Sequence, residues 1–351
     1  MRFPEFTDKW KKGYFKDVCK ITTGNKNTQD KDENGLYPFY VRSQNIERIN
    51  SWTFDGEAIL TAGDGVGVGK VFHYSIGKIG VHQRVYILSD FKCDGKYLYQ
   101  YFSSRFYNRV KRMSAKNSVD SVRMEMIADM PLYLPSVGEQ HKIGKLLALL
   151  DERISTQNKI IEDLKKLKSA ITDLLFHSIA DAHTIRLGEI AHITNGAGDV
   201  QDANTEHQED WYPFFDRSEE LKWFPTYSFD KEAVIYAGEG QSFYPRYYNG
   251  KFALHQRCYA ITDFASCIIP KYCYHFMNTL NSYFVRNSVG STVPSLRMDI
   301  FQKVEIRLPP IPKQQHICKI IDAFYTKLEV EQRGISILQE LKQFLLSQMF
   351  I

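Results

Sequence analysis

This 351-residue sequence has no long apolar run and no pattern typical of an export signal. A helix that crosses a membrane needs about 20 mostly apolar residues in succession, and no such stretch occurs. The chain starts with the charged residues Arg2, Glu5 and Asp8, whereas a signal peptide has a basic start followed by an apolar segment. The sequence therefore predicts a soluble, cytoplasmic protein that makes no membrane contact.

Paired cysteines are missing as well, although the chain contains six cysteines. None of them forms a Cys-x-x-Cys pair, and metal ligands or structural disulfides usually come in regularly spaced sets. We therefore expect no metal site, and thiols that are reduced and mostly buried. The six residues are Cys19, Cys93, Cys258, Cys267, Cys273 and Cys318.

A strong overall charge is also absent, because the net charge is only +4. The distribution is uneven, however. Residues 1–137 carry 21 Lys and Arg against 15 Asp and Glu, a net charge of +6, whereas residues 184–312 carry 12 against 15, a net charge of −3. The first region has the excess expected of a polyanion binder, and the second would bind phosphate only through local basic clusters.

What the sequence does contain is an internal repeat along its full length. The segment LPSVGEQHKI at 134–143 recurs 174 residues later as LPPIPKQQHI at 308–317, and each copy leads into a long segment with helical periodicity. The triplet HQR also occurs twice, at 82–84 and 255–257. This period is too long for a solenoid and indicates two similar domains, each followed by a long helix. We predict a first domain at 1–137, a central helix at 138–183, a second domain at 184–312 and a C-terminal helix at 313–351.

Both long segments carry apolar residues at alternating steps of four and three. This average spacing of 3.5 residues is the seam of a coiled coil, and such a stripe needs a partner of similar length. Each helix is the obvious partner of the other, and they run antiparallel if the ends of the second domain lie close together. The predicted apolar seam comprises Ile143, Leu147, Leu150, Ile154, Ile161, Leu164, Ile171, Leu175, Ile317, Ile321, Phe324, Leu328, Ile335, Leu338 and Leu345.

Four polar residues interrupt this seam at equivalent places: Gln157 with Glu331, and Lys168 with Lys342. They could fix the register of the two helices or lie at the edge of the pair, and we favour the edge, since a lysine side chain can extend its charge to water. A segment of roughly 34 residues at ~1.5 Å each is about 50 Å long. Such a pair could hold its two domains apart by a length that corresponds to on the order of ten base pairs of B-DNA.

The two repeated domains have the composition of mixed folds. Short β-branched and aromatic runs such as 58–61, 79–81 and 85–88 predict strands, and the aromatic segments 97–113 and 272–286 predict helices. The fold class is therefore α+β, with two repeated domains separated by two long helices that pair as an antiparallel coiled coil.

A glycine-rich segment, GDGVGVGK at 63–70, does not match a phosphate-binding P-loop. That loop has Gly five residues before the Gly of Gly-Lys, where Asp64 stands, and Ser or Thr after the Lys, where Val71 stands. A tight turn between strands explains the glycines better. No motif that would hold a methyl donor or a flipped adenine is present, so we assign no catalytic residue.

Several segments combine the basic, amide and hydroxyl groups that bind phosphates and base edges. They are the HQR triplets, the polar loops before the last strand of each domain, the glycine run and the segment YPRYY at 244–248 that replaces it. Each segment also has a purely structural explanation. The HQR side chains could bond buried carbonyls, the polar loops could be solvated loops capped by serines, and the aromatic residues could belong to the core. The candidate DNA-binding residues are Arg42, Ser43, Lys70, His82, Gln83, Arg84, Lys116, Asn117, Ser118, Ser121 and Arg123 in the first domain, and Arg217, Ser218, Tyr244, Arg246, Tyr247, Lys251, His255, Gln256, Arg257, Ser288, Ser291, Thr292, Ser295 and Arg297 in the second.

With these features, the chain resembles the DNA specificity subunit of type I restriction-modification systems over its full length. The segment RFPEF at 2–6 and the helix start at 134–143 carry the likeness, while the second helix start has Lys313 where Glu is usual. The resemblance implies two target-recognition domains that read the halves of a bipartite sequence in double-stranded DNA. It also implies that the helices dock two adenine methyltransferase subunits and, through them, restriction and translocase subunits. S-adenosylmethionine, ATP and Mg would bind in those partners, and no cofactor in this chain.

Two other functions stay open from the residues alone. One is a self-contained DNA-modifying enzyme, which methyl transfer by the isolated chain would support. The other is a structural or tethering protein whose duplicated domains do not bind DNA. A chain that shows no binding to DNA at any salt concentration would support this function. We expect a non-catalytic specificity subunit.

Overall fold

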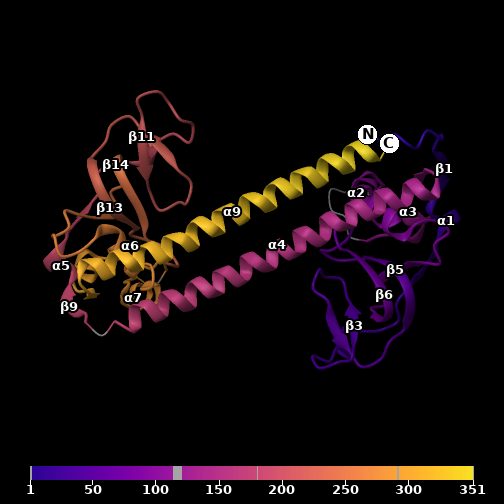
Figure 1. Cartoon of the computed structure of the whole chain (residues 1–351), viewed down its shortest axis with the longest axis horizontal. Coiled ribbons are helices and arrows are strands. Elements are labelled where there is room, and N and C mark those ends of the chain that lie inside the picture. The colour runs from indigo at the N-terminus through magenta and orange to yellow at the C-terminus, as the bar shows by residue number, and fades with distance from the viewer. Residues whose placement is uncertain (1, 114–120, 180, 291, 351) are drawn as a thin grey trace. The chain divides into compact units, whose positions relative to one another are not determined.

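A computed structural model describes residues 2–113, 121–179, 181–290 and 292–350, and the chain divides into two compact units. Unit 1 comprises Met1–Lys159 and Arg333–Ile351, and unit 2 comprises Ile160–Gln332. Two long helices, α4 (Val137–His177) and α9 (Ile311–Met349), each contribute to both units. Each unit therefore contains one sheet domain and a part of each long helix (Figure 1).

Both units contain a six-stranded sheet with the same strand order, and only one strand pair in each sheet is parallel. In unit 1 the order is β2 (Lys20–Thr23), β7 (Val85–Ser89), β5 (Phe54–Ala62), β6 (Phe72–Val81), β3 (Tyr37–Tyr40), β4 (Glu47–Ile49). In unit 2 it is β10 (His192–Asn195), β15 (Cys258–Thr262), β13 (Phe229–Ala237), β14 (Arg246–Leu254), β11 (Tyr212–Phe215), β12 (Lys222–Phe224). The strands predicted at 58–61, 79–81 and 85–88 are confirmed.

A two-stranded sheet lies where each domain meets its long helix. In unit 1, β1 (Lys11–Tyr14) pairs with β8 (Pro131–Leu134), and in unit 2, β9 (His183–Arg186) pairs with β16 (Glu305–Leu308). Four short helices flank these strands: α1 (Phe15–Val18), α3 (Met124–Ala128), α5 (Leu187–Ile190) and α8 (Met298–Gln302). The α+β class and the duplication predicted from the sequence are thus confirmed.

The aromatic helix of unit 1, α2 (Gly95–Met113), supplies much of that unit's core. Phe102 stacks on Phe106 with 4.4 Å between ring centroids, and Phe72 of β6 meets Phe102 edge-on at 5.4 Å. Tyr97 and Tyr101 pack against Phe350, which follows α9. Burial of such large rings is the main stabilising contribution of this helix.

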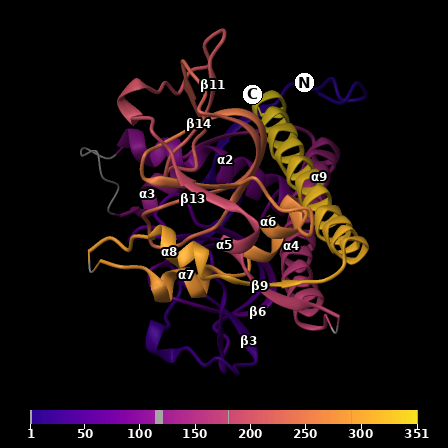
Figure 2. The same ribbon diagram turned by 90° about the vertical axis from the view of Figure 1, so that its left-hand side faces the viewer.

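The helix predicted at 272–286 is wrong in one respect, since unit 2 has two shorter helices there. These are α6 (Pro270–Met277) and α7 (Asn281–Asn287). The hydroxyl of Thr279 donates to the carbonyl of Phe276 at 2.7 Å, and the Tyr236 hydroxyl donates to the carbonyl of Met277 at 3.0 Å. Both bonds occupy carbonyls at the end of α6, and such side-chain bonds compete with helix continuation. Figure 2 shows α6 beside the end of α4 and the start of α9.

A buried glutamine fixes the start of each long helix in the same way. The Gln140 side chain accepts from the backbone N–H of Asp94 at 3.0 Å and donates to the carbonyl of Pro135 at 2.8 Å. The Gln314 side chain accepts from the N–H of Ile269 at 2.9 Å and donates to the carbonyl of Pro309 at 2.8 Å. The repeated Leu-Pro…Gln pattern therefore ties the last strand of each domain, the aromatic helix and the long helix together.

The long helices pack antiparallel within each unit, as predicted. In unit 1, Asp151 of α4 pairs with Lys342 of α9, and Leu147 of α4 shares a core with Met349 at the end of α9. In unit 2, the ammonium of Lys168 of α4 lies 4.1 Å from the ring centroid of Tyr325 of α9. The start of α4 thus meets the end of α9, and the later part of α4 meets the early part of α9.

The residues expected at the apolar seam are all buried or half-buried. Of the polar interruptions, Lys168 and Lys342 are half-buried, as expected for long side chains that extend toward water. Gln157, in contrast, is only 4% exposed. The expectation that it lies at the edge is wrong, because its shorter side chain cannot reach water in the same way.

Four of the six cysteines are buried and all six are free. Across the described ranges, no group of three or more His, Cys, Asp or Glu side chains is arranged to hold a metal ion. None of the helices in the same ranges has the length and hydropathy needed to cross a membrane.

Candidate nucleic-acid interface

Two arginines and one carboxylate form an exposed cluster on unit 1, which we call the first arginine cluster. Arg42 follows β3, Asp64 follows β5, and Arg84 precedes β7. The Arg42 guanidinium donates to Asp64 at 2.9 Å, and the Arg84 Nε lies 3.7 Å from the other Asp64 oxygen. The arginine side chains are 46% and 65% exposed, whereas that of Asp64 is 26% exposed. The acid therefore holds two guanidinium groups side by side at the surface.

Unit 2 repeats this arrangement with a glutamate, and we call it the second arginine cluster. Glu239 follows β13 and accepts from Arg217 at 3.3 Å and from Arg257 at 2.8 Å. Both arginine side chains are 62% exposed, and that of Glu239 is 18% exposed. The predicted residues Arg42, Arg84, Arg217 and Arg257 are thus brought together in equivalent pairs.

The carboxylates at the centre of these clusters were missed by the sequence reasoning. Asp64 and Glu239 each follow a repeated glycine at the end of the long strand, and that alignment was the available signal. One carboxylate between two arginines leaves a local charge of about +1 and restricts both guanidinium groups. A restricted fork is suited to bidentate contact with a guanine edge or a phosphate, because less conformational freedom is lost on binding.

The HQR triplets divide into buried and exposed parts. His82 is 5% exposed and His255 is 9% exposed, and the Nδ1 of each accepts from the N–H of the arginine two residues later, at 3.0 and 3.1 Å. Burial lowers the pKa of His82. These buried histidines hold the turn. We therefore assign them a positioning role in place of the direct contact with DNA that we expected. Gln83 and Gln256 remain exposed beside the arginines.

The polar loops before the last strand end beside the arginine clusters. The backbone of Ser121 forms an isolated antiparallel β-bridge with Asp64, and that of Ser295 forms one with Glu239. The residues that follow them donate backbone N–H groups to the carbonyls of Gly63 and Gly238, at 2.7 Å in both units. In unit 1, a cavity is lined by Asp64, Gln83, Arg84, Ser121 and their neighbours. The predicted residues Lys116, Asn117, Ser118 and Ser291 lie outside the described residues.

Arg123 and Arg297 lie two residues after Ser121 and Ser295 in the chain. Each is exposed and directly precedes a short helix, α3 or α8. Arg297 lines a separate cavity with Tyr283, Asn287 and Lys303.

The glycine run makes the tight turn that we predicted, between β5 and β6. A side chain at Gly67 would place its Cβ 2.4 Å from the backbone oxygen of Arg42, so only glycine allows this close approach. Lys70 ends the turn with its ammonium 5.2 Å from the ring centroid of Tyr107. Ser43 bonds within its own loop, to the carbonyl of Asn45. Neither Lys70 nor Ser43 belongs to the first arginine cluster.

The corresponding segment of unit 2 is held internally. Arg246 is half-buried and donates to the carbonyls of Asp216 and Ser218, so it supports the loop that carries Arg217. Tyr247 donates to Glu232, and Tyr244 is 57% exposed. Within this one predicted contact segment, Arg246 therefore supports a loop, whereas Tyr244 is exposed.

Within the described residues, the other candidates of unit 2 form no bond to the side chains of the second arginine cluster. Lys251 lies 4.7 Å from the ring centroid of Tyr227, and Ser288 donates to the carbonyl of Val285. Thr292 is exposed in the loop before Ser295. These residues do not contribute to the repeated arrangement.

The comparisons with known proteins agree on one family. The model described as "Type I restriction modification DNA specificity domain" matches residues 7–166 and 180–343. The type I restriction enzyme EcoDI specificity subunit of Escherichia coli is 27% identical over 166 residues, 46% of this chain and 36% of that protein. A putative type I restriction enzyme specificity subunit of Haemophilus influenzae is 21% identical, with 88% of this chain and 85% of that protein covered. The chain thus spans about a third of the first relative and most of the second.

A solved structure has the same fold. The S subunit of a type I restriction-modification system from M. genitalium superposes with a TM-score of 0.75 at 16% identity, covering 99% of this chain and 97% of the other. At this level of identity the likeness concerns the fold alone.

Proposed function

This chain belongs to the type I restriction modification DNA specificity family, and we propose that it reads the target sequence for such a system without catalysing a reaction itself. The observation that carries this proposal is the repeated arginine cluster. Two equivalent surfaces, each with two exposed arginines held by one acid, are suited to two separate half-sequences.

Each cluster would work by direct contact with DNA. An arginine fork pairs bidentately with the O6 and N7 atoms of guanine, or with a phosphate. The neighbouring Gln83 and Gln256 offer the amide that pairs with adenine. Because the loops around the two clusters differ in sequence, we expect the two half-sequences to differ as well.

Two methyltransferase subunits are the proposed partners. The support is the duplication of the helix starts: the same glutamine contacts tie α4 and α9 to their domains in both units. These buried contacts give the two helix starts the same local framework, and a framework that occurs twice is suited to presenting equivalent docking surfaces to two copies of one partner. Restriction and translocase subunits would join through these methyltransferases.

The test is to map methylated adenines in DNA modified by this chain with its methyltransferase partner. We expect one bipartite, asymmetric sequence with a spacer of constant length. Methylation by the isolated chain would refute the non-catalytic role. Methylation by the complex without any shared sequence would refute target reading.

A further inference from the structure

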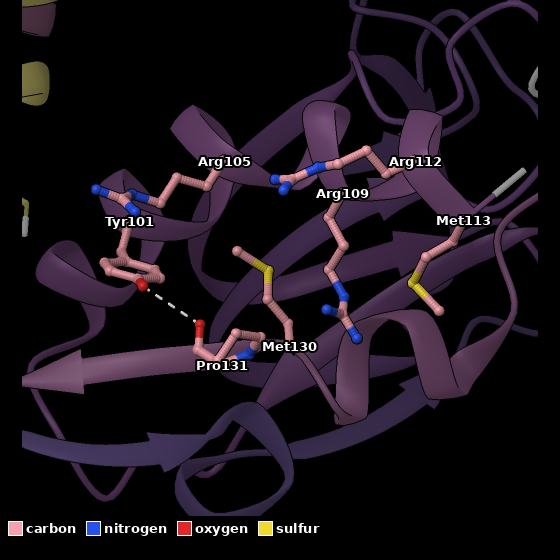
Figure 3. Close-up of a pocket in the computed structure, with 7 residues that line it drawn as sticks. All are labelled: Tyr101, Arg105, Arg109, Arg112, Met113, Met130 and Pro131. Carbon is pink, nitrogen blue, oxygen red and sulfur yellow. Dashed lines mark hydrogen bonds between the residues drawn. The ribbon is translucent and has the colours of Figure 1, made fainter.

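Three arginines of unit 1 line a pocket that is separate from the first arginine cluster. Arg105, Arg109 and Arg112 extend from one face of α2, as their spacing of four and three residues dictates (Figure 3). The cavity measures about 250 Å³, and Met130 and Pro131 at the start of β8 line it opposite the helix. We call it the α2 pocket.

The pocket arginines are held by neutral groups. Arg109 donates to the carbonyls of Met126 and Asp129 at 2.8 and 2.9 Å, and Arg112 donates to the carbonyl of Asn108 at 3.2 Å. Arg105 donates to the carbonyl of Phe350 at 2.6 Å. These bonds orient the guanidinium groups but leave several N–H donors on each one.

Their charges have no carboxylate partner within the part of the chain that the structure describes. The nearby acid Asp129 pairs with Lys16 at 2.8 Å instead. Arg105 and Arg109 are half-buried, and the lining includes Met113 and Met130. Positive charge that is partly removed from water and not compensated attracts an anion strongly, and guanidinium groups bind phosphate bidentately.

The α2 pocket lies close to the DNA-reading surface along the chain. Ser121, which bridges to Asp64, and Met130, which lines the pocket, are joined by nine residue steps that include the helix α3. A chain of this length with one helical turn spans at most about 25 Å. A duplex bound at the first arginine cluster would present backbone phosphates within this range, at about 3.4 Å per base pair along its axis.

Unit 2 does not repeat these three arginines: the cavity beside Asn287 is lined instead by Arg297, Asp299 and Lys303, of which Lys303 pairs with Asp299 at 2.7 Å. With the offset of 175 that aligns Tyr97 with Tyr272, the three arginines correspond to Leu280, Phe284 and Asn287. A partner that docks as two equivalent copies would need the same surface on both units. A continuous asymmetric ligand, such as a DNA duplex, has no such requirement.

From this asymmetry and this chemistry we propose that the α2 pocket is a phosphate clamp that binds the DNA backbone beside the half-sequence read by unit 1. The inference rests on the proposed function. The clamp adds affinity without sequence information, because phosphates are alike along the duplex. It also gives the first domain, residues 1–137 with a net charge of +6, the larger share of nonspecific binding.

The test compares Arg112→Gln with Lys111→Gln in the complete complex of this chain with its methyltransferase. Both changes remove one positive charge from the last turn of α2, but Lys111 does not line the pocket. Arg112 is chosen because, among the described residues, its hydrogen bond is to Asn108 of the same helix, so the fold should tolerate the change. Binding to a labelled duplex is measured between about 50 and 200 mM salt, on target and scrambled DNA.

We expect Arg112→Gln to lower the slope of log affinity against log salt by about 0.9, the value for one lost phosphate contact. Between about 50 and 200 mM salt, the variant should therefore lose about threefold less affinity than the wild type, equally on target and scrambled DNA. Lys111→Gln should keep the wild-type slope. Trimming the duplex beside the half-sequence of unit 1 should remove the difference between wild type and Arg112→Gln.

An unchanged slope for Arg112→Gln, or the same change for Lys111→Gln, would overturn the clamp. Weaker assembly with the methyltransferase at an unchanged DNA slope would overturn it too, in favour of an acidic protein partner. A wild-type complex that does not prefer its target would refute the proposed function instead. The slopes of log affinity against log salt on scrambled DNA would then still test the clamp.

Discussion

The two units share their internal framework and differ at their edges. The glutamine at each helix start and the buried histidine turn occur in both units with nearly equal distances. The acid between two arginines also occurs in both, at 2.9 and 3.7 Å in unit 1 and at 3.3 and 2.8 Å in unit 2. Among the described residues, the three-arginine pocket on α2, the glycine run and the unbroken aromatic helix occur only in unit 1. The shared glutamine and histidine contacts bind backbone groups, whereas the arginine clusters and the features of unit 1 alone lie where a ligand would approach. Duplication has kept the framework and allowed the ligand-facing surface to diverge.

The shared framework is tested most strongly at the buried glutamines. Gln140→Ala leaves two backbone groups without their partner, and Gln314→Ala leaves three, since Gln314 also donates to the carbonyl of Cys267 at 2.8 Å. At about 1–3 kcal/mol for each unsatisfied buried group, we expect each change to cost its unit about 2–5 kcal/mol. Hydrogen exchange of the β8 and β16 amides measures the loss in each unit separately.

Gln315→Ala is the matched control, because that neighbour is exposed on the same helix. A large loss in one unit and none in the other would show that the two helix starts are not equivalent. The comparison between the units would then fail at its most similar point.

Arg84→Ala and Arg257→Ala should break the recognition of different half-sequences. Each removes one exposed guanidinium from one arginine cluster, and a lost bidentate base contact costs about 1–3 kcal/mol. We expect binding to become about tenfold or more weaker, with relaxed preference at one half-sequence only. Competition binding with DNAs altered in either half measures this, and Lys20→Ala on exposed β2 controls for lost charge. Equal effects of Arg84→Ala on both halves would contradict separate reading.

The sequence predicted the features that depend on periodicity and spacing. Apolar steps of four and three identified the helix pair, and the repeated HQR triplets identified equivalent positions. It did not predict the break after Met277, because the carbonyl that Tyr236 occupies lies 41 residues away in the chain. Nor did it identify Asp64 or the α2 pocket, since both depend on loops that are brought together only in the folded domain.

The smallest expected effect concerns pH and a buried histidine of unit 2. His275 of α6 bonds Asp322 of α9 at 2.9 Å, and the equivalent position of unit 1 is Gln100, which bonds Asp151 of α4 at 2.6 Å. Burial lowers the pKa of His275 below its ordinary value of 6.5, although Asp322 opposes the shift. The unfolded chain therefore takes up a proton at this side chain at a higher pH than the folded chain does. The stability of unit 2 is then fully present above about pH 6.5 and falls as the pH drops below that value.

His275→Gln should remove this part of the acid sensitivity, because glutamine can still donate to Asp322 and does not titrate. We expect hydrogen exchange of the α6 amides to accelerate between pH 7.5 and 5.5 in the wild type by more than intrinsic exchange accounts for, and by less in the variant. His316→Gln, on the exposed face of α9, should behave as the wild type. If His275→Gln kept the full acid sensitivity, His275 would not be its cause. The difference between His275 in unit 2 and Gln100 in unit 1 would then not affect how the units respond to pH. If it lost that sensitivity, the two units would differ in their response to pH at equivalent positions of their aromatic helices, each bonded to an acid on a long helix.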